Sequence, residues 1–135
     1  MLDAISIALT GLTAQKQRLA ASASNIANVL TAGAVPVADP AVPASTVYRP
    51  LRVHLSSAGE GGGVYATVTP DENGYSVIYD PQSIFANEDG MIAIPKVDLA
   101  EEAVNVLMTK SAFKANLSII KVEEEMMGEL LDTLA

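Results

Sequence analysis

Apolar residues recur at alternating steps of three and four positions along the first thirty residues of the chain. The stripe contains one polar residue, Lys16, and otherwise consists of Leu2, Ile5, Leu9, Leu12, Leu19, Ala23, Ile26 and Leu30. This 3.5-residue repeat keeps one apolar seam on the same side of a helix, as coiled-coil packing requires. It predicts a long N-terminal α-helix over residues 1–30.

The same repeat returns at the other end of the chain. Its members are Leu99, Ala103, Val106, Phe113, Leu117, Ile120, Met127, Leu131 and Leu134, interrupted by Lys110 and Glu124. We expect a C-terminal helix over residues 98–135, with Asp98 as its cap and Glu101 at the capping-box spacing. Seven more large apolar residues lie outside the seam, which favours packing against several neighbours: Val104, Leu107, Met108, Ile119, Val122, Met126 and Leu130. The alternative is an intramolecular hairpin whose extra apolar residues cover a sheet.

The middle of the chain has a different pattern. Residues 31–46 contain three prolines among alanines and predict an extended linker. Apolar and polar residues then alternate along 47–55, 64–69 and 75–79, and Asn73-Gly74 predicts a turn with positive φ. We therefore expect a small antiparallel β-hairpin or three-stranded sheet, followed by an irregular arm through Pro95.

These patterns predict an α+β fold in which long terminal helices form a coiled-coil-like layer and a small antiparallel segment lies between them. The predicted segments are residues 1–30, 31–46, 47–97 and 98–135. The formal net charge of −8 supplies no basic patch for phosphates, which excludes nucleic acid and anionic membrane surfaces as partners. The charge is uneven: the first thirty residues carry about +1 and residues 98–135 about −5, which favours pairing of unlike ends.

Residues that could carry chemistry are sparse. The chain has no cysteine, and no motif places a serine or aspartate beside its single histidine, His54. Residues 71–74 and 87–90 superficially resemble calcium loops but lack the full ligand spacing, and they read as turns. We therefore predict no enzyme, no cofactor, no metal site and no small-molecule substrate. No apolar run reaches about 18 residues, and no cleaved signal peptide is predicted, so these signals alone favour a cytoplasmic protein.

Four short segments resemble those of a known family. Ser24-Asn25-Ile26-Ala27-Asn28, at the end of the first predicted helix, resembles the signature of bacterial flagellar rod and hook proteins. The segments Tyr79-Asp80-Pro81 and Ala86-Asn87-Glu88-Asp89-Gly90 are similar to those of proximal rod proteins of the FlgC type. Ala112-Phe113-Lys114-Ala115-Asn116 resembles the C-terminal helix motif of that family.

This resemblance implies a structural subunit that polymerises helically in the proximal rod of the flagellar basal body and transmits torque from motor to hook. Its partners would be copies of itself, other rod proteins and the flagellar type III export apparatus. The resemblance also implies a periplasmic location reached without a cleaved signal peptide, in place of a cytoplasmic one, and no direct insertion into the membrane.

We expect the two stripes and the Asn25 and Asn28 pair to form the subunit interfaces; the alternative for the pair is that its amides cap the end of their own helix. The interface residues so predicted are Leu9, Leu12, Leu19, Asn25, Ile26, Asn28, Val106, Phe113, Asn116, Leu117, Ile120, Met127 and Leu131. The charged members of the stripes, Lys16, Lys110 and Glu124, are candidate register markers. Two other functions stay open: a free-standing coiled-coil dimerisation or binding module, and an acid-base enzyme that uses His54, Asp71, Glu72 and Asp89.

Overall fold

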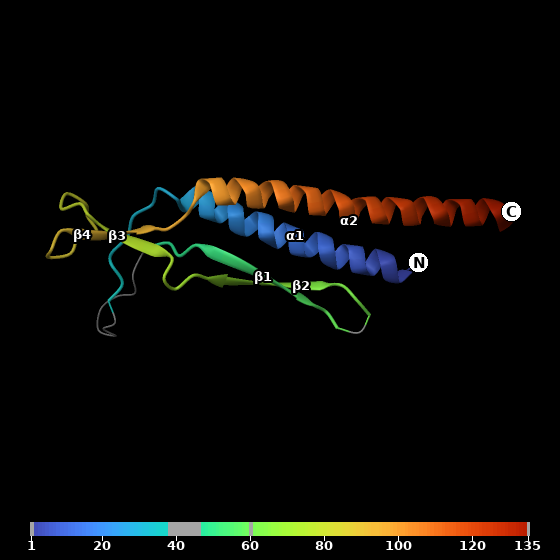
Figure 1. Ribbon diagram of the computed structural model, residues 1–135, viewed down its shortest axis with the longest axis horizontal. Coiled ribbons are helices and arrows are strands. Elements are labelled where there is room, and N and C mark those ends of the chain that lie inside the picture. The colour runs from blue at the N-terminus through green and yellow to red at the C-terminus, as the bar shows by residue number, and fades with distance from the viewer. Residues whose placement is uncertain (1, 38–46, 60, 135) are drawn as a thin grey trace. The chain divides into compact units, whose positions relative to one another are not determined.

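The computed structural model describes residues 2–37, 47–59 and 61–134. Two helices stand at the ends of the chain and four strands lie between them (Figure 1). The elements in order are α1 (Leu2–Asn28), β1 (Leu51–Ser57), β2 (Val64–Pro70), β3 (Tyr75–Tyr79), β4 (Met91–Pro95) and α2 (Leu99–Leu134). The predicted α+β class is confirmed. Most of the predicted linker, residues 38–46, lies outside the described residues.

The predicted cap of the second helix is confirmed. Oδ1 of Asp98 accepts hydrogen bonds from the backbone N–H groups of Ala100 (2.8 Å) and Glu101 (3.3 Å), which the helix itself leaves without partners. At the other boundary, α1 ends at Asn28, where the backbone N–H and the hydroxyl of Thr31 both donate to the Asn28 carbonyl. Local hydrogen bonds therefore fix where each helix meets the middle of the chain.

The strands form two separate two-stranded sheets, β1–β2 and β3–β4. The expected hairpin across Asn73-Gly74 is wrong, because β3 pairs with β4 in antiparallel register from Tyr75↔Pro95 to Tyr79↔Met91. The prediction of an irregular arm through Pro95 is wrong for the same reason. β4 is an unbroken apolar segment with no alternation, as suits a strand that is buried on both faces.

Ala93 shows why β4 is buried. On one side it pairs with Val77 of β3, and on the other it forms an isolated bridge with Gly33, with both N–H···O distances at 2.9 Å. Ala93 has no exposed surface and Ile92 is almost completely buried. The glycine just after α1 thus supplies a second hydrogen-bonded edge for β4.

The turn at residues 71–74 differs from the expected one. Its glycine, Gly74, does not have the positive φ that the Asn-Gly pair predicts; among the described residues, positive φ occurs only at five other glycines. Gly74 is required for space instead, because a Cβ there would lie 2.6 Å from Cδ of Pro50. Its backbone N–H closes the turn onto the carbonyl of Asp71.

The chain divides into two compact units, and both helices contribute to each. Unit 1 comprises Met1–Ala20, Val53–Val68 and Val104–Ala135, and unit 2 comprises Ala21–Arg52 and Thr69–Ala103. Unit 1 therefore holds most of the two helices and of the β1–β2 hairpin, and unit 2 holds the β3–β4 sheet. None of the described helices is long and apolar enough to cross a membrane.

Candidate functional site

The apolar stripe of α1 is largely exposed in the structure. Leu9, Leu19 and Ile26 are exposed, and Leu12 is half-buried. The buried positions of α1 are instead small or polar: Ala8, Gly11, Ala14, Gln15, Ala21, Ser22 and Asn25. Five of these lie one position before a member of the stripe, so the stripe points about 100° away from the side that packs within the chain. The large apolar residues are thus left available for contacts outside the chain.

A close approach of the two helices in unit 1 explains the glycine at position 11. A Cβ added at Gly11 would lie 2.5 Å from Oδ1 of Asn116 on α2, so any larger residue there would force the Asn116 side chain to shift. The Asn116 side chain is half-buried, and its Nδ2 donates to the carbonyl of Ala112 at 2.9 Å. Asn116, which the sequence predicts at a subunit interface, therefore has a packing role within the chain.

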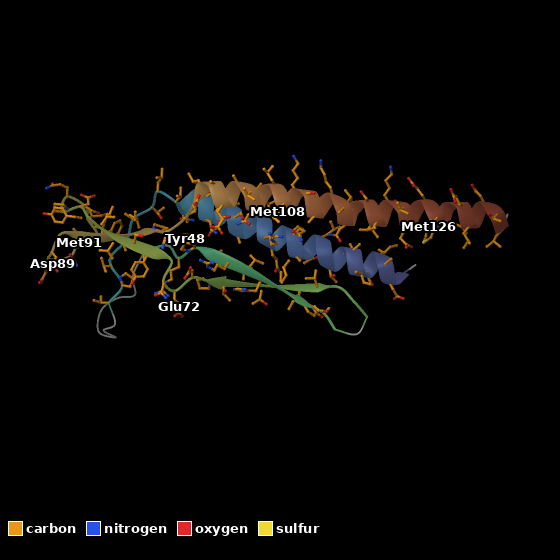
Figure 2. The ribbon with its side chains drawn as sticks, viewed as in Figure 1. Tyr48, Glu72, Asp89, Met91, Met108 and Met126 are labelled. Atoms are coloured by element: carbon orange, nitrogen blue, oxygen red, sulfur yellow. The ribbon has the colours of Figure 1, made fainter. Side chains whose placement is uncertain are left out.

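The stripe of α2 is exposed along most of its length. Leu117, Met127 and Leu131 are exposed, Leu117 by 50 %, whereas Val106, Phe113 and Ile120 are half-buried. The apolar residues outside the seam are also exposed: Val104, Leu107, Met108, Ile119, Val122, Met126 and Leu130. Figure 2 shows side chains, Met108 and Met126 among those labelled, along the whole length of this helix. Burial within the chain therefore accounts for little of the apolar surface of α2.

The charged members of the stripes are exposed as well. Lys16, Lys110 and Glu124 all lie at the surface, and within the described part of the chain no ion pair involves any of them. The one ion pair along α2 joins Lys121 and Glu125, one turn apart at 3.7 Å. The three charges are thus available to a neighbour, and their role as register markers stays a prediction.

Asn25 occupies a different environment, in the interior of unit 2. Its Nδ2 donates to the carbonyl of Leu51 (3.0 Å) and to Oε1 of Glu102 (2.6 Å). Its Oδ1 accepts the N–H of Leu51 (2.7 Å) and the hydroxyl of Tyr48 (2.8 Å), and the residue is only 2 % exposed. An amide has two donors and two acceptor positions, so all four are occupied. Asn25 joins α1, the first residue of β1 and α2.

We call Asn25, Tyr48, Leu51 and Glu102 the Asn25 hub. The sequence does not reveal this cluster because its members lie far apart in the chain, up to 77 positions for Asn25 and Glu102. Asn28, the other member of the asparagine pair, has a different environment. It is half-buried, and its Nδ2 donates to the Ser24 carbonyl at 2.8 Å. An intersubunit bond from Asn25 would require breaking one of the bonds above.

The carboxylate of Asp71, in the turn at residues 71–74, has its partners within the chain. Asp71 Oδ1 accepts the N–H of Asn73, and Asp71 Oδ2 pairs with the Arg52 guanidinium at 2.9 Å. The hydrogen bond from Arg52, assisted by the Asn73 N–H, lowers the pKa of Asp71. Glu72, Asp89 and His54 are exposed, and the described residues include no group of three or more acidic or histidine side chains placed to hold a metal ion.

Both ends of the chain match families of flagellar rod proteins. Residues 5–34 match the family described as flagella basal body rod protein, and residues 88–133 match the flagellar basal body rod FlgEFG protein C-terminal family. The flagellar basal-body rod protein FlgC of Escherichia coli O157:H7 is 30 % identical, with 97 % of this chain and 96 % of that protein covered. FlgC of Borreliella burgdorferi is 30 % identical (99 % and 97 % covered), and FlgC of Bacillus subtilis 28 % (95 % and 94 %).

The matched regions coincide with the features described above. They contain the apolar stripe of α1 from Ile5 onward, β4 with the last residues of the loop before it, and nearly all of α2. The similarity to complete FlgC proteins extends over the middle of the chain as well. The chain therefore belongs to the FlgC-type flagellar basal-body rod proteins and is a structural subunit of the rod.

Proposed function

We propose that the exposed apolar stripes of α1 and α2 are the surfaces through which neighbouring subunits pack in the rod. The burial pattern of α1 supports this most directly: its buried residues are small or polar, and most of its large apolar residues are exposed. Burying the exposed half of one leucine contributes on the order of 1 kcal/mol, so a stripe of such residues is a substantial driving force. The coiled-coil-like layer thus forms between subunits.

The breadth of the exposed apolar surface on α2 favours several neighbours for each subunit. A two-stranded coil covers only one seam, whereas apolar residues of α2 are exposed well outside it, at Met108 and Val122 for example. In the rod, this would give each α2 helix partners on more than one side. Copies of the chain and other rod proteins are the proposed partners.

The cellular role follows from this mode of assembly. The subunit is exported through the flagellar type III apparatus and polymerises helically in the periplasm as part of the proximal rod. Torque from the motor passes to the hook through the packed helices. This role requires no catalytic site, cofactor or metal ion. Lys16, Lys110 and Glu124 select the register, because a charge in an apolar seam disfavours alignments that leave it unpaired.

Leu117→Glu tests the proposal. The side chain is half exposed, so the isolated chain should keep its helix content and thermal unfolding midpoint, whereas rods should be absent from basal bodies of cells that carry only this variant. The matched control is Ser118→Glu, which adds the same charge at the next position, on the polar side of α2. Electron microscopy of basal bodies and circular dichroism of the purified chain give the two measurements.

Normal rods in the Leu117→Glu strain would contradict the proposal. The dimerisation-module alternative makes a different prediction, because a purified dimer should strongly protect the ends of both helices from hydrogen exchange. A rod subunit that lacks its neighbours should leave the backbone amides near the end of α2 poorly protected. Sedimentation of the purified chain, combined with that exchange measurement, distinguishes the two functions.

A further inference from the structure

The loop between β3 and β4 presents an isoleucine to solvent. Ile84 is 91 % exposed, although isoleucine is among the residue types most often buried. It lies within the segment 80–90, whose backbone ends are joined by a hydrogen bond from the Asp80 N–H to the Gly90 carbonyl at 2.9 Å. We call this segment the β3–β4 loop.

Turns on both sides of Ile84 hold the β3–β4 loop in shape. Before it, the N–H of Ser83 donates to the Asp80 carbonyl (3.2 Å), and after it the N–H of Ala86 donates to the Ser83 carbonyl (3.1 Å). Farther on, Oδ1 of Asn87 accepts the N–H groups of Asp89 (3.0 Å) and Met91 (2.9 Å). An exposed apolar side chain on a prearranged loop loses little conformational entropy on docking.

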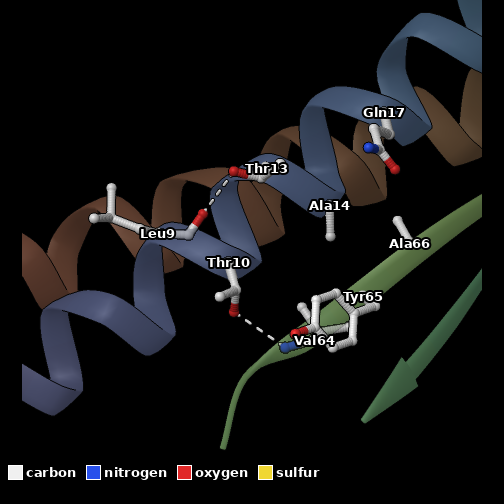
Figure 3. A pocket seen from close by; sticks show the side chains of 8 residues that line it. All are labelled: Leu9, Thr10, Thr13, Ala14, Gln17, Val64, Tyr65 and Ala66. Atoms are coloured by element: carbon white, nitrogen blue, oxygen red, sulfur yellow. Dashed lines mark hydrogen bonds between the residues drawn. The ribbon is translucent and has the colours of Figure 1, made fainter. Parts of the chain in front are cut away.

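Unit 1 contains an apolar pocket of about 290 Å³ between α1 and β2 (Figure 3). Its lining residues are Leu9, Thr10, Thr13, Ala14, Gln17, Val64, Tyr65 and Ala66. The volume is ample for one aliphatic side chain, since a cavity of about 150 Å³ accommodates benzene. Thr10 fixes the pocket wall, because its hydroxyl accepts the Val64 N–H at 3.0 Å and donates to the Ile7 carbonyl at 2.7 Å.

The loop and the helix that carry the two features differ in charge. The β3–β4 loop carries Asp80, Glu88 and Asp89 and no basic residue. Gln17 of the pocket is flanked in sequence by Lys16 and Arg18, which are the basic residues of α1. Opposite charge around an apolar contact favours encounter and correct alignment of the two surfaces.

We infer that Ile84 of one subunit inserts into the α1–β2 pocket of a second copy of this chain. The contact joins two different patches of the same protein, so it is heterologous, and repetition of such a contact generates a ring if the rotation closes and an open helical filament if it does not. This inference rests on the proposed function in that it takes the rod to contain neighbouring copies of the chain. It adds a specific contact in which a loop outside both stripes meets a pocket that includes Leu9 of the α1 stripe.

Disulfide cross-linking tests the contact, and the chain offers a clean background because it has no cysteine. The variant pair is Ile84→Cys with Ala66→Cys in one full-length chain, assembled in cells and oxidised in isolated basal bodies. Cysteines cross-link only when their Cα atoms come within about 7 Å. We expect a ladder of dimers and higher multimers on a non-reducing gel. The control pair, Ile84→Cys with Thr67→Cys, moves one thiol to the opposite face of β2 and should stay monomeric.

Two further outcomes decide against the inference. Rods that assemble normally without any 84–66 cross-link would overturn it and leave the stripe proposal untouched. A cross-link from position 84 to another rod protein would show that the occupant is not a second copy.

A variant that keeps the pocket intact gives an independent measurement: Ile84→Ser should reduce the number of rods, and Ile84→Leu should restore it. Circular dichroism of both chains should match that of the parent, because the side chain is exposed.

Discussion

The interior of unit 2 contains polar groups that are fully hydrogen-bonded, whereas the helix surface of unit 1 exposes large apolar groups. In unit 2 a buried amide, Asn25, has every hydrogen-bonding position occupied, and β4 lies between two hydrogen-bonded edges. In unit 1 the helices approach through Gly11 and leave residues such as Leu117 and Leu131 exposed. The polar groups inside unit 2 find their partners within the chain, whereas the helix surface of unit 1 keeps large apolar side chains exposed.

This difference separates residues that stabilise the subunit from residues that assemble it. A buried amide that loses its partners destabilises the monomer, because each group left unsatisfied costs about 1 to 3 kcal/mol. A half-exposed leucine contributes little to the monomer but is available for an interface. Variants in the two regions should therefore change different measurements.

The largest effect on the monomer is expected for Asn25→Ala. The change removes four hydrogen bonds and leaves the Leu51 N–H and the Glu102 carboxylate without this partner, so we expect a loss of about 3 kcal/mol in the free energy of unfolding. Urea denaturation of the purified chain measures it. Asn28→Ala is the matched control, since that amide makes a single bond to the carbonyl one turn back, and it should cost well under half as much. Equal losses would contradict the separate role of the Asn25 hub.

A smaller loss is expected for Gly11→Ala. Alanine gains about 1 kcal/mol of helix propensity over glycine, but the new Cβ collides with the Asn116 amide, and overpacking typically costs about 1 to 3 kcal/mol. We expect a net loss of about 1 kcal/mol. The double variant Gly11→Ala with Asn116→Ala should recover the propensity gain, which a double-mutant cycle would detect as coupling. A stabilising Gly11→Ala single variant would indicate that the helices can separate freely.

The smallest effect concerns the Arg52–Asp71 pair at the surface of unit 2. Because the pKa of Asp71 is lowered in the folded chain, the pair stabilises the fold at neutral pH, and this contribution is lost as the pH falls through that lowered pKa. Arg52→Ala should therefore be slightly less stable than the parent at pH 7 and equal to it in strong acid. Thermal unfolding across that pH range measures the difference. A gap that stays constant with pH would mean that Arg52 acts through packing alone.

Much of the fold could be predicted from local patterns. The heptad spacing predicts both helices to within two residues of their observed ends, and Asp98 is a cap because its carboxylate lies beside the first free N–H groups. The motif around Asn25 and the loop at 86–90 indicates the rod family, which the comparisons confirm. These features depend on residues that are close together in the sequence, so they can be predicted from the sequence alone.

Strand pairing and the Asn25 hub could not be predicted in this way. Two strands with suitable alternation flank Asn73-Gly74, yet β3 pairs with the apolar segment Met91–Pro95. Pairing depends on which edge is free once the whole chain is packed, and the Gly33 bridge that completes β4 comes from another part of the sequence. Tyr48 and Glu102 reach Asn25 for the same reason.

The sequence by itself determined that two long helices carry apolar stripes, because a 3.5-residue repeat requires only a regular helix to align its members on one side. Only the tertiary structure decided which side of α1 packs within the chain. Ala8, Gly11 and Gln15 follow the same spacing one position earlier, and their small or polar side chains give no apolar signal. At Gly11 the side chain of Asn116 lies too close for a larger residue, and the large apolar residues one position along the helix face outward.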